Sequence, residues 1–172
     1  MSQPAGNDAL ARDLMSRPVR RLTSRMPVRD AAEFLTRHGI SGAPVEDEHG
    51  RWLGVFSMTD LARAVASKLC LPRAERSLEA REPVPSNTAS SLETLATLQV
   101  GDVMTPGMVT VFPDSSIGEV LRSLLNFKVH RVFVIEAESG SLEGIITTMD
   151  VLGWLDHTRR QATTVRREHR NP

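Results

Sequence analysis

Hydrophobic residues recur along this chain at two spacings, and the same succession of spacings appears twice. In each half, apolar positions three and four residues apart predict an amphipathic helix of about three turns. The two apolar stripes are Val28, Ala31, Ala32 and Leu35, and Ile117, Val120, Leu121, Leu124 and Leu125. Ser116 and Glu119 have the spacing of a capping box, Pro27 suits the first position of a helix, and Gly39 suits its end. The sequence therefore predicts one bounded helix in each half.

Short β-prone runs follow each of these helices and are separated by polar turns that contain glycine, which is typical of a hairpin. The runs cover residues 43–46 and 52–56 in the first half and 131–135 and 142–148 in the second. A further helix closes each half, over 61–69 after Asp60 and from 151 to 155 and beyond after Asp150. One β-α-β-β-α unit is too small to cover both faces of its sheet. We therefore expect an α+β fold in which two such repeats pack as a pseudo-twofold pair with a shared, sandwich-like core.

The amino acids themselves also repeat. Residues 13–16 (Asp-Leu-Met-Ser) align with residues 102–105 (Asp-Val-Met-Thr) at an offset of 89, and after one inserted residue Asp60 aligns with Asp150 at an offset of 90. Two copies of a unit of about 55 residues indicate an internal duplication. We expect a flexible N-terminus over 1–10, a first repeat over 11–71, a Pro- and Ser-containing linker over 72–98, a second repeat over 99–160 and a basic C-terminal tail over 161–172.

Composition narrows the class of protein. The 172 residues are 40% hydrophobic, which is enough for one compact domain or two small units, and the formal net charge is zero. The single cysteine, Cys70, cannot form an intramolecular disulfide, and no Cys/His cluster has the spacing of a zinc site. No apolar run approaches the roughly 18 residues that cross a bilayer. We expect a cytoplasmic protein with no membrane partner and no metal.

The candidate chemistry lies where a strand runs into the closing helix. Residues 54–60 (Gly-Val-Phe-Ser-Met-Thr-Asp) are echoed by residues 144–150 (Gly-Ile-Ile-Thr-Thr-Met-Asp). Free N–H groups and the helix dipole favour an anion such as phosphate at such a place, and an aspartate a few ångströms away can accept two vicinal ribose hydroxyls. Ser, Thr and Asp are also ordinary N-cap residues that need no ligand. From the residues alone, nucleotide binding and simple capping both remain open.

These residues resemble a known family, the tandem cystathionine-β-synthase-type (CBS) domain pair or Bateman module, over about residues 11–160. The resemblance rests on the two Asp-x-Met-Ser/Thr segments, on residues 40–45 (Ile-Ser-Gly-Ala-Pro-Val) and 129–134 (Val-His-Arg-Val-Phe-Val), and on both Gly-x-x-Ser/Thr-x-x-Asp closures. It implies the same β-α-β-β-α repeat and a disc-shaped homodimer.

The resemblance also implies two clefts built crosswise, each with the adenine held by one repeat and the ribose and phosphate held by the other. The first cleft would contain Ile40, Ser41, Gly42, Pro44, Thr147 and Asp150. The second would contain Val129, His130, Arg131, Ser57, Thr59 and Asp60. The repeats differ at one further position, because Arg21 aligns with Thr110, where family members often offer a hydroxyl to the ligand. Arg21 would clamp a phosphate or fill the cleft.

No nucleophile elbow, phosphate-binding loop or Cys/His pair is present, so we expect no enzymatic activity. The preferred function is a regulatory module that binds an adenosyl ligand, AMP, ADP or ATP ahead of NAD or S-adenosylmethionine, requires no cofactor, and signals to an effector protein. The alternative is a dimerisation scaffold with empty clefts. A third hypothesis is nucleic-acid binding through residues 156–172, which contain five Arg against Asp156 and Glu168, although no aromatic residue is present there to stack on bases.

Overall fold

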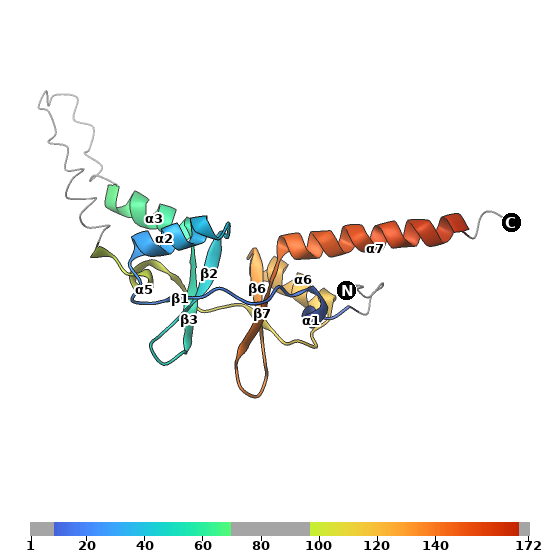
Figure 1. Cartoon of the computed structure of the whole chain (residues 1–172), viewed down its shortest axis with the longest axis horizontal. Coiled ribbons are helices and arrows are strands. Elements are labelled where there is room, and N and C mark those ends of the chain that lie inside the picture. Colours follow the sequence, from blue (N-terminus) through green and yellow to red (C-terminus); the bar gives the residue numbers. More distant parts are fainter. Residues whose placement is uncertain (1–8, 70–96, 169–172) are drawn as a thin grey trace, which may run out of the picture. The chain divides into compact units, whose positions relative to one another are not determined.

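The computed structural model describes residues 9–69 and 97–168. The chain divides into two compact units, of which one comprises Arg20–Met108 and the other comprises the chain up to Val19 together with Val109 onward. Each unit is a mixed α+β structure built around one small sheet (Figure 1). The predicted order β-α-β-β-α is confirmed in both.

The unit of residues 20–108 contains a four-stranded sheet in the order β1-β2-β3-β4. Its elements are β1 (Leu22–Thr23), α2 (Val28–Arg37), β2 (Gly42–Glu46), β3 (Trp52–Ser57), α3 (Met58–Leu69), α5 (Val100–Val103) and β4 (Thr105–Pro106). The first pair of strands is parallel, and the β2–β3 hairpin and the β3–β4 pair are antiparallel. The buried core of this unit consists of Leu22, Val28, Ala31, Leu35, Ala43, Val45, Phe56 and Val100. Leu35, the last residue of the predicted apolar stripe, is fully buried.

The other unit contains a three-stranded sheet in the order β5-β6-β7. Its elements are α1 (Ala11–Leu14), β5 (Thr110–Val111), α6 (Ile117–Asn126), β6 (Arg131–Ile135), β7 (Leu142–Thr147) and α7 (Thr148–Glu168). β5 is parallel to β6, and β6 and β7 form the predicted antiparallel hairpin. The buried core consists of Ala9, Ala11, Leu14, Val111, Ile117, Val120, Leu124, Val132, Val134, Ile146, Val151 and Trp154.

Each repeat exchanges its opening segment with the other repeat. Residues 11–16 pack on the sheet of the second repeat, where the backbone of Ser16 pairs with Ile145. Residues 100–106 pack on the first repeat, where β4 pairs with Gly54 and Val55 of β3. In Figure 1 the dark blue α1 accordingly lies beside α6, whereas the yellow-green α5 lies near α2 and α3. The two compact units therefore do not coincide with the two sequence copies.

Glycines allow the two exchanged segments to approach the sheets. A Cβ built on Gly54 would lie 2.2 Å from the carbonyl oxygen of Thr105, and one on Gly144 would lie 2.4 Å from Met15 Sδ. Real Cβ atoms do not approach other atoms so closely, so both positions require glycine.

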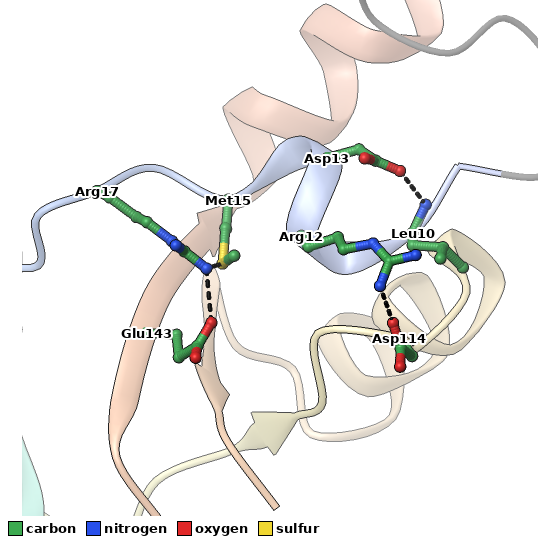
Figure 2. Close-up of polar contacts among 7 residues, drawn as sticks. All are labelled: Leu10, Arg12, Asp13, Met15, Arg17, Asp114 and Glu143. Carbon is green, nitrogen blue, oxygen red and sulfur yellow. Dashed lines mark hydrogen bonds and ion pairs between the residues drawn. The ribbon is translucent and has the colours of Figure 1, made fainter.

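The ion pairs of the N-terminal segment add to this docking (Figure 2). Arg12 pairs with Asp114, and Arg17 Nη2 lies 2.6 Å from Glu143 Oε2 on β7. Both pairs are largely exposed and each contributes at most about 1 kcal/mol, so the buried side chains of Ala11 and Leu14 hold the segment in place.

The helix boundaries follow the predicted caps with small shifts. Ser116 accepts the N–H of Glu119 and Glu119 accepts the N–H of Ser116, so the capping box of α6 is confirmed. Pro27 is the N-cap of α2 rather than its first residue, and Gly39 ends the helix at a φ of +62°. The closing helices begin earlier than expected, at Met58 and Thr148, because the Ser/Thr-x-x-Asp segments are themselves capping boxes.

The last helix extends into the expected basic C-terminal tail. Residues 162–168 belong to that tail in the sequence prediction, but α7 continues through them to Glu168, because propagation of a helix needs no further tertiary contact at each step. The expected linker falls almost wholly outside the described residues, as do positions 1–8 and 169–172. The repeat boundaries 11–71 and 99–160 therefore remain predictions.

Candidate functional site

The strand–helix junction of the first repeat is organised around a buried carboxylate. Asp60, only 2% exposed, accepts on Oδ2 the N–H of Ser57 at 2.8 Å and the Ser57 hydroxyl at 2.6 Å. Its own N–H donates to Ser57 Oγ at 3.4 Å, which completes a capping box at the start of α3. Its other oxygen, Oδ1, accepts the Thr105 hydroxyl at 2.8 Å and Arg63 Nη1 at 2.9 Å. The simple capping role proposed from sequence is thus present here, with two further donors.

The second repeat reproduces the capping half of this arrangement. Asp150 Oδ2 accepts the N–H of Thr147 at 2.7 Å and its hydroxyl at 2.6 Å, and the N–H of Asp150 lies 3.3 Å from Thr147 Oγ1. Asp150 is half-buried rather than buried. Its Oδ1 accepts no hydrogen bond from any residue that the structure describes.

Each junction also contacts the segment that precedes its own middle strand. The N–H of Met58, the first residue of α3, donates to the carbonyl of Ser41 at 3.0 Å, and the N–H of Thr148 donates to the carbonyl of His130 at 3.1 Å. Two of the N–H groups expected to be free at the helix N-termini are therefore already satisfied by the backbone. Within each unit, the predicted base-binding segment and the closing motif of the same repeat lie side by side.

The other predicted site residues of the first repeat differ in exposure. Gly42 and Pro44 are buried in β2, where Gly42 pairs with Ser57 and Pro44 with Val55. Ile40 packs against the core. Ser41 and Thr59 are exposed. Pro44 is less than 2% exposed, so its side chain acts in packing within this unit, and Ser41 and Thr59 offer the accessible hydroxyls.

The second repeat places its predicted residues in the matching positions. Val129 packs against the core, His130 is exposed, and Arg131 is half-buried at the start of β6, paired with Thr147 of β7. Thr110 lies exposed on β5 opposite Phe133.

Arg21, the residue that departs from the repeat pattern, is held at the edge of the first sheet. Its Nη1 lies 3.1 Å from Glu46 Oε2, and its guanidinium carbon lies 5.8 Å from the centre of the Trp52 ring. A guanidinium over an indole face is an attractive arrangement. The Arg21 side chain is 60% exposed, so it fills no buried space within this unit.

Histidine and metal chemistry add little within the described ranges. No group of three His, Cys, Asp or Glu side chains that could hold a metal ion occurs among residues 9–69 and 97–168. His38 is the C-cap residue of α2. Desolvation, followed by the nearby Arg20 and Arg37, lowers the pKa of His38 below its ordinary value of 6.5, which favours the neutral imidazole. Its ring packs edge-on to Phe34 at 4.5 Å between centroids.

Sequence reasoning missed two residues of this site, Arg63 and Thr105. Arg63 could have been found, because residues three apart on a helix face each other and Asp60 precedes it by three. Thr105 is 45 residues from Asp60, and its position depends on the exchange of opening segments.

No long apolar helix that could span a membrane occurs in the part of the chain that the structure describes.

Comparison with known proteins agrees with this architecture. The chain is 31% identical over 150 residues to CBS domain-containing protein CBSX2, chloroplastic, of Arabidopsis thaliana, covering 84% of this chain and 58% of that protein. It is 22% identical over 142 residues to L-aspartate semialdehyde sulfurtransferase of Methanocaldococcus jannaschii, covering 83% of this chain and 22% of that protein. The chain therefore spans less than two thirds of the length of either relative.

Solved structures share the fold. A crystal structure of CBSX2 in complex with AMP superposes with a TM-score of 0.61 at 24% identity, covering 91% of this chain and 98% of that one. The CBS domain pair of protein MJ0100 in complex with 5′-methylthioadenosine and S-adenosyl-L-methionine gives 0.65 at 21% identity, with coverages of 87% and 97%. The family model of the CBS domain matches two stretches, residues 11–67 and 100–157, one in each copy of the repeat. With both copies matched, the chain belongs to the CBS domain family.

Proposed function

We propose that this chain is a non-catalytic regulatory module that binds an adenosyl ligand through its duplicated strand–helix junctions. The observation that carries the proposal is the duplication of the Ser/Thr-x-x-Asp motif, in which Asp60 and Asp150 each accept the N–H and the hydroxyl of the residue three positions earlier at a strand–helix junction. Membership of the CBS family and the adenosyl ligands named for two structural neighbours support the choice of ligand.

The proposed ligand contacts follow the crosswise pattern that the family resemblance implies. One cleft would use Ile40, Ser41, Gly42 and Pro44 for the base and Thr147 and Asp150 for the ribose and phosphate. The other would use Val129, His130 and Arg131 with Ser57, Thr59 and Asp60. Thr110 would add a hydroxyl beside one ligand, and Arg21 would stand at the matching place beside the other. AMP, ADP and ATP are the preferred ligands, ahead of NAD and S-adenosylmethionine.

The proposal is tested by a thermal-shift screen of the full chain with these five ligands, followed by calorimetric titration with the best one. A ligand present at 100 times its dissociation constant should raise the free energy of unfolding by about 2.7 kcal/mol. GTP is the control, because it keeps the ribose and phosphates and changes the base. If no adenosyl compound shifts the unfolding temperature, the scaffold hypothesis replaces the binding hypothesis.

A second copy of the chain is the proposed partner besides the effector protein. Met149, Leu152 and Leu155 lie three residues apart on α7 and are 71%, 55% and 45% exposed, while Val151 and Trp154 of the same helix are buried in the core. α7 therefore carries a second apolar stripe that no described part of its own unit covers, and burial of this stripe in a homodimer would remove it from water. We also propose a cytoplasmic location for the protein, which the single cysteine predicts.

A further inference from the structure

The two closing motifs are equivalent in sequence but differ in how their carboxylates are used. On Asp60, both oxygens are occupied, Oδ2 by the N–H and hydroxyl of Ser57 and Oδ1 by Arg63 and Thr105. On Asp150, Oδ2 is occupied in the same way by Thr147, and Oδ1 has no donor among the residues described. A carboxylate has about four acceptor sites in all. All of these acceptor sites are occupied on Asp60, and two of them remain open on Asp150.

The missing donors can be traced to two substitutions between the repeats. The residue that aligns with Arg63 at the offset of 90 is Gly153, which has no side chain. The residue that aligns with Thr105 at the offset of 89 is Ser16. Ser16 occupies the matching place on its sheet, because its N–H donates to the carbonyl of Ile145 at 2.9 Å, but its hydroxyl is not bonded to Asp150. The backbone is therefore repeated, and the side-chain donors are not.

We propose that only the Asp150 motif accepts a vicinal diol, and that Arg63 and Thr105 withhold Asp60 from the ligand and make it a structural residue. This inference rests on the proposed function and assigns that function to one of the two motifs. Two vicinal hydroxyls bring two donors, which match the two acceptor sites left on Asp150 Oδ1. At Asp60 the same hydroxyls would first have to displace a hydrogen bond from a cation and one from a threonine hydroxyl, both to an ionised group.

Arg63 is thus a specificity-determining residue, and its role can be transferred. A Cβ built on Gly153 has no atom within 4 Å, so a side chain can be added there without collision. An arginine at 153 would stand three residues after Asp150, the same spacing that lets Arg63 reach Asp60 at 2.9 Å. Gly153→Arg should therefore occupy the open oxygen of Asp150 while it leaves the fold intact.

The test is calorimetric titration of the full chain with AMP. We expect the wild type to bind one AMP per chain, and Gly153→Arg to weaken that binding at least about tenfold. Gly153→Ala and Gly153→Met are the matched controls, because they add helix-compatible side chains without a cation, and we expect wild-type affinity from both. Arg63→Gly combined with Thr105→Val should release Asp60 and add a second binding event.

Each other outcome has a distinct meaning. If AMP binds the wild type and Gly153→Arg does not weaken it, or if the wild type binds two AMP molecules with equal affinity, the inference is wrong and the proposed function stands. If Gly153→Met weakens AMP binding as much as Gly153→Arg does, the size of the added side chain rather than its ion pair with Asp150 reduces the affinity, and the inference is also wrong. If none of AMP, ATP and S-adenosylmethionine binds the wild type, the proposed function fails and the assignment of its site fails with it.

Discussion

Thr105 Oγ1 donates a hydrogen bond of 2.8 Å to Asp60 Oδ1, which joins the opening segment of the second repeat to the closing motif of the first. The backbone pairing of Val55 with Thr105 brings the hydroxyl to that place, and Gly54 lets the strand approach. The bond therefore depends on the exchange of segments between the two repeats, and it helps to stabilise the buried carboxylate of Asp60.

Removal of this hydroxyl should destabilise the fold measurably. Thr105→Ala deletes one hydrogen bond to a buried, ionised carboxylate, and we expect the free energy of unfolding to fall by about 1.5–2 kcal/mol. Ser16→Ala is the control at the matching position, and it should change stability by less than about 0.5 kcal/mol, as is usual for exposed residues. Urea denaturation followed by circular dichroism measures both. Equal effects of the two substitutions would mean that the bond to Asp60 contributes nothing.

The two aspartates should differ in their structural weight. On the sequence alone, both are N-cap-type residues whose loss costs about 1 kcal/mol each. We expect Asp150→Ala to lower the free energy of unfolding by this amount and Asp60→Ala to lower it by about 3 kcal/mol, because loss of the Asp60 carboxylate leaves several donors around a buried site without an acceptor. Thermal and urea unfolding of both variants without ligand checks this. Equal losses of stability would contradict the asymmetry between the repeats.

The hairpin turns make stability sensitive to acid. Asp47 and Glu136 are equivalent carboxylates that accept backbone N–H groups within their turns. These bonds, above all from the N–H of Arg51, lower the pKa of Asp47 below 3.8, and those from Ser139 lower the pKa of Glu136 below 4.5. The folded state then binds fewer protons than the unfolded state, so this stabilisation is complete above about pH 5 and is lost as the pH falls through the lowered pKa values.

Urea denaturation at a series of pH values between about 7 and 3 tests this dependence. The double variant Asp47→Asn/Glu136→Gln should be less stable than the wild type at neutral pH and should lose less stability on acidification. Glu138→Gln is the control, because its side chain is exposed and accepts no hydrogen bond among the described residues. An identical acid dependence in the wild type and the double variant would show that other groups control it.

A strained helix end offers a stabilising substitution. Lys128 has a φ of +52° at the position that aligns with Gly39, whose φ is +62°. This left-handed conformation costs a residue with a Cβ about 1 kcal/mol relative to glycine. Lys128→Gly should therefore raise the unfolding free energy by about 0.5–1 kcal/mol, and Gly39→Ala should lower it by a similar amount. Thermal unfolding of both variants measures the pair, and a loss of stability in Lys128→Gly would refute the argument.

The local structure could be predicted from the sequence because local rules determine it. The hairpins follow from alternating β-prone residues and turns, and the capping box of Ser116 follows from the four residues 116–119. The exchange of opening segments could not be predicted, because alignment of two copies shows which residues match and not which copy they pack against. The helical conformation of residues 162–168 was missed because that stretch has no apolar stripe.

The candidate site shows the same division. Asp60 and Asp150 were both found, since a carboxylate three residues after a hydroxyl at a strand–helix junction is a local pattern. The difference between the two aspartates was not predicted. It arises partly from Thr105, which is distant in sequence, and partly from Arg63. The residue that aligns with Arg63 in the second repeat is Gly153, which is found only when the alignment is extended beyond the motif. Equivalence of sequence motifs was therefore a poor guide to equivalence of chemistry.

Self-association should depend on the apolar stripe of α7. Leu152 lies at the centre of the stripe and is 55% exposed. If a second copy covers it, Leu152→Glu places an unpaired charge in an apolar interface and should convert a homodimer into the 19.0 kDa monomer at micromolar concentration. Multi-angle light scattering measures the mass. Phe112→Glu is the matched control, because Phe112 is also exposed but follows β5 outside the stripe, and that variant should remain dimeric. A monomeric wild type would exclude the homodimer, and a Leu152→Glu variant that stays dimeric would place the interface elsewhere.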